Sequence, residues 1–332
     1  MPKLTILYQS DDNYAAFMGV SICSLLENNK SAEEISIYII DDSISKNNKE
    51  LLLEMVQAYS RELFFISGEV VLNDKEITDI FAYTGMRKNT HSYLKLFLDK
   101  IMPDCSGRVI YIDCDTAVTG NIQELITLDM GQKTIGMVKD SLITKSKISV
   151  GLEECDNYYN SGIIVVDMDK WRERRCSARI LEHIKNIRIY GTVDQDVLNV
   201  ELKDEIYTLP IKYNLQPLHM VYSVELYNKV YKHKATYYSG EEIEDAVDFP
   251  GIVHYLRYMG ESPWNLNNVH PAASIFDKYL ELSPWRGYQK KAKHLSFIFK
   301  VEKWMYKYLP SWCFLRIFNI VHERMIMKSN KV

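Results

Sequence analysis

Two groups of aspartates stand where short apolar segments of the 332-residue chain end. Asp11 and Asp12 follow the first segment of strand type, and Asp113-Cys114-Asp115 follows the fourth. Side chains two apart in an extended segment point the same way, so the carboxylates of Asp113 and Asp115 repel each other unless a cation lies between them. A hard divalent cation that takes oxygen ligands meets this need. Taken alone, however, an Asp-x-Asp pair is explained better by a solvated turn or a helix N-cap.

The chain around these aspartates alternates between strand-type and helical patterns, which is typical of a mostly parallel sheet covered on both faces. We expect strands over 4–8, 35–40, 63–66, 108–112, 135–138 and 162–167. We expect helices over 14–26, after a cap at Ser45, over 93–102, over 170–185 after a cap at Asp169, and over 194–199. The tyrosine-rich stretch 208–250 is expected to be irregular and to form the acceptor side. The predicted fold class is α/β with a Rossmann-like first half, in which ligands bind beyond the carboxyl ends of the strands.

The composition limits the classes of protein to which the chain can belong. A charged fraction of 25% and a net charge of −4 argue against a disordered chain and against a nucleic-acid partner. The six cysteines include no Cys-x-x-Cys pair, so no thiolate zinc site is indicated. No signal peptide is expected, because two aspartates follow the apolar run 4–8 almost at once. No uncharged apolar run reaches the roughly 18 residues that a membrane span needs. We therefore expect a protein of the reducing cytoplasm.

The composition changes near Ser283-Pro284, which predicts two parts, a body over 1–284 and a tail over 285–332. The tail has eleven Lys and Arg against two acidic residues, many aromatic residues, and a proline at 310 that divides it into two helices. Helices with an aromatic face and a basic face bind anionic membrane surfaces, and we favour this interpretation for the tail. The alternative is a helical hairpin that packs on the body and covers its acidic surface.

Further short motifs occur in a fixed order along the chain. They are Ser10–Tyr14, Asp113-Cys114-Asp115, Asn160-Ser161-Gly162 before an apolar strand with Asp167, Asp169 and Trp171, then Asp194-Gln195-Asp196, and finally His254-Tyr255 with Gly260 and Pro263-Trp264. In this order they resemble the family 8 glycosyltransferases, and the resemblance runs from about residue 3 to about residue 285. It implies a GT-A fold, a Rossmann-like and mostly parallel sheet flanked by helices. It also implies a retaining transferase that uses a UDP-sugar and a divalent cation, similar to lipopolysaccharide galactosyl- and glucosyltransferases.

The resemblance also assigns roles to individual residues. Asp113, Asp115 and His254 would hold Mn²⁺, or another divalent cation such as Mg²⁺. The nucleotide would contact Asp11, Asn13, Lys95 and Cys114. The transferred hexose would contact Asp140, Asn160, Asp194 and Gln195, and the last two are also the candidate catalytic residues. Without the resemblance, His254 is explained better as a core histidine, Lys95 as part of a solvated helix face, and Asp140 and Asn160 as turn or cap residues.

The segment before Pro263-Trp264 departs from the family pattern. Members of the family have a lysine immediately before the Pro-Trp pair, which contacts the diphosphate, whereas this chain has Ser262 there and Glu261 beside it. Arg257 is a candidate substitute, because its planar guanidinium can bind phosphate oxygens in a bidentate manner. Arg257, Gly260 and Ser262 are therefore the candidate diphosphate residues.

These observations predict a metal-dependent, retaining hexosyltransferase. It would move glucose or galactose from a UDP-sugar to a cell-surface glycan or glycolipid acceptor, such as lipopolysaccharide or capsule, at the inner face of the membrane. No second carboxylate pair suggests a double displacement, so front-face attack is the expected mechanism. One alternative is a catalytically silent nucleotide-sugar binder in a membrane glycan-assembly complex. A sugar nucleotidyltransferase is disfavoured, because Ser10–Tyr14 contains no glycine for a phosphate-binding loop.

Overall fold

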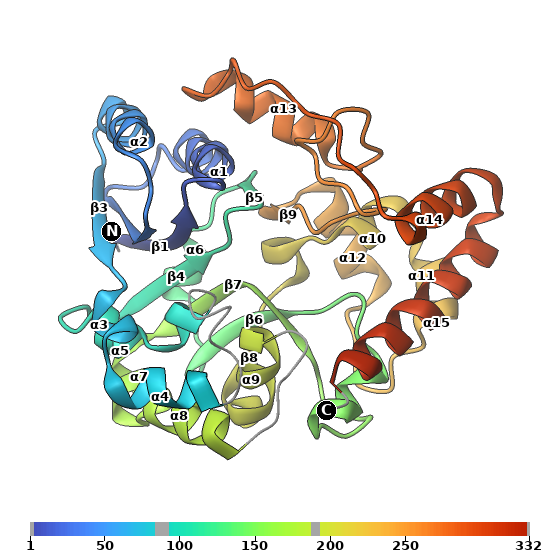
Figure 1. Ribbon diagram of the computed structural model, residues 1–332, viewed down its shortest axis with the longest axis horizontal. Coiled ribbons are helices and arrows are strands. Elements are labelled where there is room, and N and C mark those ends of the chain that lie inside the picture. The colour runs from blue at the N-terminus through green and yellow to red at the C-terminus, as the bar shows by residue number, and fades with distance from the viewer. Residues whose placement is uncertain (1–2, 84–92, 187–192, 331–332) are drawn as a thin grey trace.

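A seven-stranded sheet forms the centre of the molecule in the computed structural model, which describes residues 3–83, 93–186 and 193–330 (Figure 1). The strand order is β3-β2-β1-β4-β7-β6-β8, and β5 and β9 form a separate two-stranded sheet. The strands are β1 (Leu4–Asp11), β2 (Ile35–Asp42), β3 (Glu62–Ser67), β4 (Arg108–Ile112), β5 (Thr116–Val118), β6 (Ile135–Lys139), β7 (Tyr159–Asp167), β8 (Ile206–Thr208) and β9 (Ile252–His254).

The central sheet is mostly parallel, as the sequence predicts. Strands β1, β2, β3 and β4 pair in parallel, and so do β6 and β8. Strand β7 is the exception, because it runs antiparallel to both β4 and β6. Each of the six predicted strands is present, and the near-continuous apolar runs are explained by burial of the sheet on both faces.

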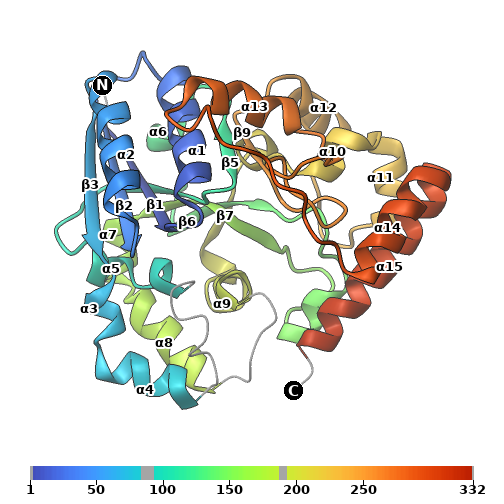
Figure 2. The same cartoon turned by 45° about the horizontal axis from the view of Figure 1, so that its top comes forward.

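Helices cover both faces of this sheet (Figures 1 and 2). Alternate residues of β1 enter different cores: Ile6 packs in the cluster that contains α1, and Leu7 packs in the cluster on the other face. The helices are α1 (Ala15–Asn28), α2 (Lys46–Ala58), α3 (Glu69–Leu72), α4 (Lys75–Tyr83), α5 (Leu98–Ile101), α6 (Glu124–Thr127), α7 (Met168–Glu173), α8 (Cys176–Asn186), α9 (Val193–Glu201), α10 (Pro217–Val221), α11 (Val224–Tyr231), α12 (Gly240–Asp248), α13 (Ala273–Leu282), α14 (Phe297–Tyr308) and α15 (Ser311–Ser329).

Two predicted helices differ from the structure. The predicted helix over 93–102 is a 3-10 turn over 93–96 followed by the short helix α5. The predicted helix over 170–185 is divided into α7 and α8, because Arg175 adopts a left-handed backbone with φ of 53°. The cap of α7 is Asp167, whose carboxylate accepts a hydrogen bond from the Lys170 backbone N–H, and not Asp169 as predicted. Asp169 instead accepts a hydrogen bond from the Gly107 N–H.

The expectation that 208–250 is irregular is wrong. This stretch contains α10, α11, α12 and the 3-10 helix η4 (Ile211–Asn214). Ser223 caps α11, and Ser239 and Glu242 form a reciprocal capping box at the start of α12. The Ser-x-x-Glu spacing of Ser239 and Glu242 indicates the start of a helix, but the expectation of irregular structure rested on the many tyrosines instead.

The tail contains two helices on either side of Pro310, as predicted, and α15 packs against α11 of the body and against α14 (Figure 2). Phe314 and Leu315 of α15 are buried in a cluster that includes Tyr227 and Tyr231 of α11. Lys303 of α14 forms an ion pair with Glu261 at 2.6 Å. These contacts are those of the packed hairpin, the alternative interpretation. Among the described residues, no helix is long and apolar enough to cross a membrane.

Glu323 is the main polar contact between α15 and the body. It is only 6% exposed, and its carboxylate accepts hydrogen bonds from the backbone N–H groups of Thr144, Lys145 and Ser146 and from the Thr144 hydroxyl. Burial raises the pKa of Glu323, but the hydrogen bonds from Thr144 and Ser146 outweigh it, so the pKa lies below its usual range. The carboxylate therefore fixes α15 to the segment that follows β6.

Replacement of Glu323 by glutamine is expected to destabilise the fold, because an amide cannot accept all of these hydrogen bonds and its N–H₂ group faces other donors. We expect a loss of roughly 2–3 kcal/mol in the free energy of unfolding, measured by urea denaturation. The matched control is Glu173→Gln, an exposed glutamate of α7, for which the change stays within about 0.5 kcal/mol.

The wild type and the Glu323→Gln variant also give a prediction about pH. A carboxylate whose pKa is depressed by folding stabilises the protein fully above its unfolded pKa of about 4.3, and this contribution is lost as the pH falls through the folded pKa. The difference in unfolding free energy between the wild type and Glu323→Gln is therefore constant between about pH 6 and 8 and shrinks below about pH 4.3. A difference that grows towards acidic pH would contradict this assignment.

Candidate active site

An acidic cleft of about 470 Å³ lies at the carboxyl ends of β1 and β4. Five of the lining residues that the structure describes are aspartates, and one is a lysine. The complete lining is Gln9, Ser10, Asp11, Tyr14, Asp42, Lys95, Tyr111, Asp113, Cys114, Asp115, Ser161, Asp194 and Gln195. A site with this excess of carboxylates is suited to a cationic ligand or to an anion that arrives together with a cation.

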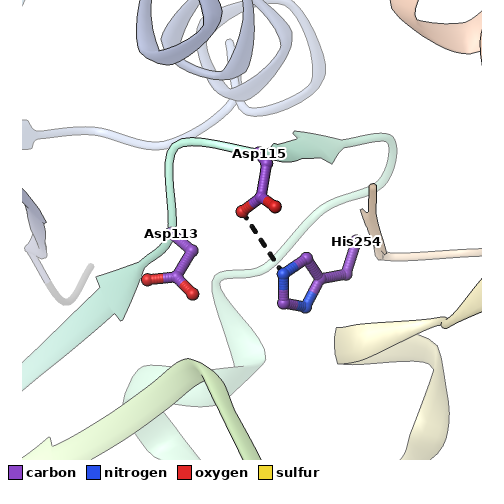
Figure 3. A group of neighbouring side chains, drawn as sticks. All are labelled: Asp113, Asp115 and His254. Atoms are coloured by element: carbon purple, nitrogen blue, oxygen red, sulfur yellow. Dashed lines mark ion pairs between the residues drawn. The ribbon is translucent and has the colours of Figure 1, made fainter. Parts of the chain in front are cut away.

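Asp113, Asp115 and His254 lie together beside this cleft, as predicted (Figure 3). Asp113 follows β4, Asp115 precedes β5, and His254 ends β9, which pairs with β5 so that Thr116 is opposite His254. One ligand atom from each of the three side chains lies within 4.8 Å of the others, and Nε2 of His254 is 3.3 Å from Oδ1 of Asp115. Two carboxylates and an imidazole fit a divalent cation such as Mn²⁺.

The orientation of the imidazole is fixed by Asn214, a residue that the sequence analysis did not select. Asn214 donates through Nδ2 to Oδ1 of Asn160 at 2.9 Å, so its own Oδ1 faces Nδ1 of His254 at 3.0 Å. Nδ1 therefore carries a proton, and Nε2 is directed towards Asp115. Burial lowers the pKa of His254, but the Asp115 carboxylate outweighs it and the net pKa is raised. Nε2 can therefore hold a proton that faces the carboxylates, or it can bind a metal cation that the carboxylates also bind.

Gly162 allows this arrangement, because the imidazole lies directly against it. A Cβ atom at this position would lie 2.2 Å from Cε1 of His254. The glycine of the Asn160-Ser161-Gly162 motif is therefore required for space rather than for an unusual backbone conformation.

Lys95 is buried in the cleft, so its interpretation as part of a solvated helix face is wrong. The side chain is 6% exposed, and Nζ lies 2.6 Å from Asp194 and 3.6 Å from Asp113. Burial lowers the pKa of Lys95, but the Asp113 and Asp194 carboxylates more than compensate and raise it. Burial raises the pKa of Asp194, but Lys95 and the Ser161 hydroxyl outweigh burial and the net pKa is lowered, so Asp194 remains ionised. Lys95 thus neutralises part of the acidic cleft.

The four predicted donor-sugar residues belong to one hydrogen-bonded network, in which Asp140 contacts Asn160 and Gln195 directly and Asp194 is joined through Ser161. Oδ2 of Asp140 accepts hydrogen bonds from Asn160 at 3.1 Å and from Gln195 at 3.4 Å. Ser161 links the other pair, because its N–H donates to Gln195 and its hydroxyl donates to Asp194. Asp194 and Gln195 line the cleft, whereas Asp140 and Asn160 are buried behind them. A continuous series of hydrogen bonds therefore runs from the metal-site histidine through Asn214 and Asn160 to Asp140.

The predicted nucleotide residues lie at different depths. Asp11 lines the cleft and accepts hydrogen bonds from the Tyr14 N–H and from the side chain of Asn13, which is exposed. Cys114 also lines the cleft, but its thiol donates to the Gln9 carbonyl at 3.0 Å. Burial raises the pKa of Cys114, so the thiol stays protonated and is unsuited to bind a cation.

The predicted diphosphate residues lie in the segment after β9. Arg257 is exposed near the cleft, where it opposes the effects of burial and of Asp115 on the pKa of Tyr14. Gly260 has a φ of 73°, and Ser262 is buried with its N–H donating to Asn265. A second cation is present here, which sequence reasoning missed.

That cation is Lys293 of the tail, whose Nζ donates to the Gly260 carbonyl at 2.7 Å. Burial lowers the pKa of Lys293, and Arg257 lowers it further, which places the two cations near each other. The charge of the tail was visible in the sequence, but the packing that brings position 293 to this segment was not.

Residues 5–267 match the family described as Glycosyl transferase family 8. The chain belongs to this family. General stress protein A of Bacillus subtilis (strain 168) is 29% identical over 280 residues, which cover 83% of this chain and 92% of the relative. Lipopolysaccharide 1,2-glucosyltransferase of Escherichia coli (strain K12) is 25% identical over 310 residues, which cover 88% of this chain and 85% of the relative.

Solved structures of family 8 enzymes share the fold. The apo structure of the bifunctional glycosyltransferase WbbM superimposes with a TM-score of 0.69 at 20% identity, over 86% of this chain and 50% of that one. The galactosyltransferase LgtC in complex with donor and acceptor sugar analogs gives a TM-score of 0.63 at 22% identity, over 86% of this chain and 99% of that one. The predicted GT-A architecture of this family 8 chain is thereby confirmed.

Asn214→Leu should lower the affinity for Mn²⁺ by about 10- to 100-fold, because the imidazole loses the hydrogen bond that directs Nε2 towards the carboxylates. Isothermal titration of Mn²⁺ in the presence of UDP measures the change. Asn47→Leu, at an exposed position of α2, is the control and should bind Mn²⁺ like the wild type. Equal affinities for all three proteins would rule out the orienting role of Asn214.

Proposed function

We propose that this family 8 glycosyltransferase transfers glucose or galactose, with retention, from a UDP-sugar to a cell-surface glycan or glycolipid. The supporting observation is that Asp113 and Asp115, which cluster with His254, line the same cleft as Asp194 and Gln195, and Gln195 is hydrogen-bonded to the buried Asp140. Relatives named lipopolysaccharide 1,2-glucosyltransferase and lipopolysaccharide 1,3-galactosyltransferase support the choice of sugar and acceptor. The proposed cofactor is Mn²⁺ or another divalent cation such as Mg²⁺.

Each side chain has a distinct part in the proposed reaction. Asp113, Asp115 and His254 would hold the divalent cation, which, when bound, neutralises charge that develops on the leaving diphosphate. Asp194 and Gln195 would bind hydroxyl groups of the hexose, and Asp140 and Asn160 would orient Gln195. The carboxylate of Asp194 is already bound by Lys95 and Ser161, which makes it a poor nucleophile. This favours front-face attack, in which the leaving diphosphate accepts the proton of the acceptor hydroxyl.

Asp115→Asn should lower the release of UDP by more than about a hundredfold, because a neutral amide replaces one of the two carboxylates that hold the cation. The assay uses UDP-glucose and UDP-galactose, with and without acceptor. Chelation should have the same effect, and Mn²⁺ should restore activity to the wild type only. Asp248→Asn, at an exposed position of α12, is the control and should remain active.

The same assay separates catalysis from the alternative function. A wild-type protein that binds UDP-sugar but releases no UDP with any acceptor would favour the silent scaffold. Full transferase activity after exhaustive chelation would exclude the proposed role of the cation.

Arg257 and Lys293 are the proposed replacements for the lysine that the family has at position 262. Arg257→Ala should lower kcat/KM for the UDP-sugar by about 10²–10³-fold, since a donor aimed at developing charge is removed. Lys293→Ala should have a smaller effect in the same direction, because its ammonium already binds the Gly260 carbonyl. Arg286→Ala, at an exposed arginine of the tail, is the control. Unchanged turnover of both Arg257→Ala and Lys293→Ala would leave Lys95 as the cation nearest the diphosphate.

We also propose that the tail associates with the cytoplasmic face of an anionic membrane. The packed hairpin leaves large aromatic side chains outside, among them Phe297 at 80%, Trp304 at 58% and Trp312 at 57% exposure. Aromatic residues next to exposed Lys and Arg are the composition that interfacial helices have.

The double variant Trp304→Ser/Trp312→Ser should bind phosphatidylglycerol vesicles at least tenfold more weakly, since burial of each indole contributes about 2 kcal/mol. Co-sedimentation with the vesicles measures the change. Phe249→Ser removes a 78% exposed aromatic side chain of the body and should leave binding unchanged. Equal binding of both variants would contradict the membrane role of the tail.

A further inference from the structure

A second cavity lies on the far side of the donor-sugar residues, between α11, the segment after β6, and α15. Its volume is about 620 Å³, larger than that of the acidic cleft. Six cationic side chains line it: Lys145, Lys229, Lys232, Lys234, Arg316 and Arg324. We call this cavity the basic groove. Its charge is opposite to that of the acidic cleft.

The cations of the basic groove are not neutralised by the protein. None of the six forms an ion pair within the part of the chain that the structure describes, whereas Lys290 and Lys303 of the same tail are paired with Asp277 and Glu261. Glu323 also lines the groove, but its carboxylate is directed to the backbone of Thr144–Ser146. Six like charges around one cavity repel each other, so an anion placed there would be favoured by all of them.

Tyr231 provides an independent indication of a ligand. It lines the basic groove, is 3% exposed, and has a buried hydroxyl without a hydrogen-bond partner. A buried hydroxyl that is left unpaired has a considerable energetic cost, which a ligand with acceptor oxygens removes. Burial raises the pKa of Tyr231 well above its usual value, so the hydroxyl remains a donor. A neutral donor beside cations suits an oxyanion such as a phosphate.

The basic groove is connected to the proposed sugar site through a short stretch of chain. Oδ1 of Asp140 accepts hydrogen bonds from the N–H groups of Leu142 and Ile143, and the next two residues, Thr144 and Lys145, line the groove. Oδ2 of Asp140 contacts Gln195 of the cleft. The segment that lines the basic groove therefore also carries Asp140, which contacts the proposed sugar-binding Gln195.

We propose that the basic groove binds a phosphate or diphosphate group carried by the lipid-linked acceptor. The identity of the acceptor rests on the proposed function, whereas the affinity for phosphate does not. The same chemistry could be supplied by the phosphate of an anionic membrane headgroup, so the test has one arm for each source.

The first arm titrates inorganic diphosphate, in excess EDTA, into the wild type and into Lys229→Gln/Lys232→Gln/Lys234→Gln. The matched control is Lys46→Gln/Lys75→Gln/Lys278→Gln, which neutralises three exposed lysines on α2, α4 and α13. All three proteins share the acidic cleft, so only binding in the groove differs. We expect the groove variant to bind diphosphate about a hundredfold more weakly than the other two, because each of the three lysines near an anionic group contributes roughly fivefold. Equal affinities in the three proteins overturn the proposal.

The second arm measures co-sedimentation with phosphatidylcholine vesicles with and without phosphatidylglycerol. If the groove variant loses diphosphate binding but keeps the preference for phosphatidylglycerol, the groove serves the acceptor, as proposed. If it loses both, the phosphate site stands but its source is the membrane headgroup, and the assignment to the acceptor is overturned. Failure of the proposed sugar transfer would appear separately, as absent UDP release by a protein that still binds diphosphate in the groove.

Discussion

The contact between the His254 imidazole and Gly162 determines how the rest of the cleft is built. It brings β9, from one sheet, against β7, from the other, at a distance that no larger residue at position 162 would permit. From this contact the hydrogen bonds continue through Asn214 and Asn160 to Asp140. The residues proposed to bind the cation and those proposed to bind the sugar therefore belong to one rigid unit, and a displacement at either end is transmitted to the other.

Basic side chains balance part of the negative charge in the cleft. Lys95 lies between Asp113 and Asp194, and His254 faces Asp115, so each of these three carboxylates has a basic side chain beside it. The pKa values of Lys95 and His254 are both raised despite burial, which shows that the carboxylates are the stronger influence. A bound divalent cation would replace the proton on His254 as the positive charge that faces Asp115.

The apolar runs were sufficient to predict the strands, because they are local signals. The cluster of Asp113, Asp115 and His254 was predicted only through the ordered set of motifs that resembles the family, since His254 by itself looked like a core histidine. The sequence was insufficient for Asn214 and Lys293, whose contacts depend on how distant segments pack. Asp169 was mistaken for a helix cap because Asp167, two residues earlier, satisfies the same pattern. Lys95 was assigned to a helix that the structure replaces with a 3-10 turn, and only its burial between two carboxylates shows what it contacts.

The tail contacts the two segments that flank the proposed active site. Glu323 binds the backbone at Thr144–Ser146 after β6, and Lys293 and Lys303 bind Gly260 and Glu261 after β9. Neither segment can move outward without breaking contacts with α14 or α15. If the tail also docks on a surface, thermodynamic linkage requires that any effect of docking on substrate affinity be matched by an equal effect of substrate on docking.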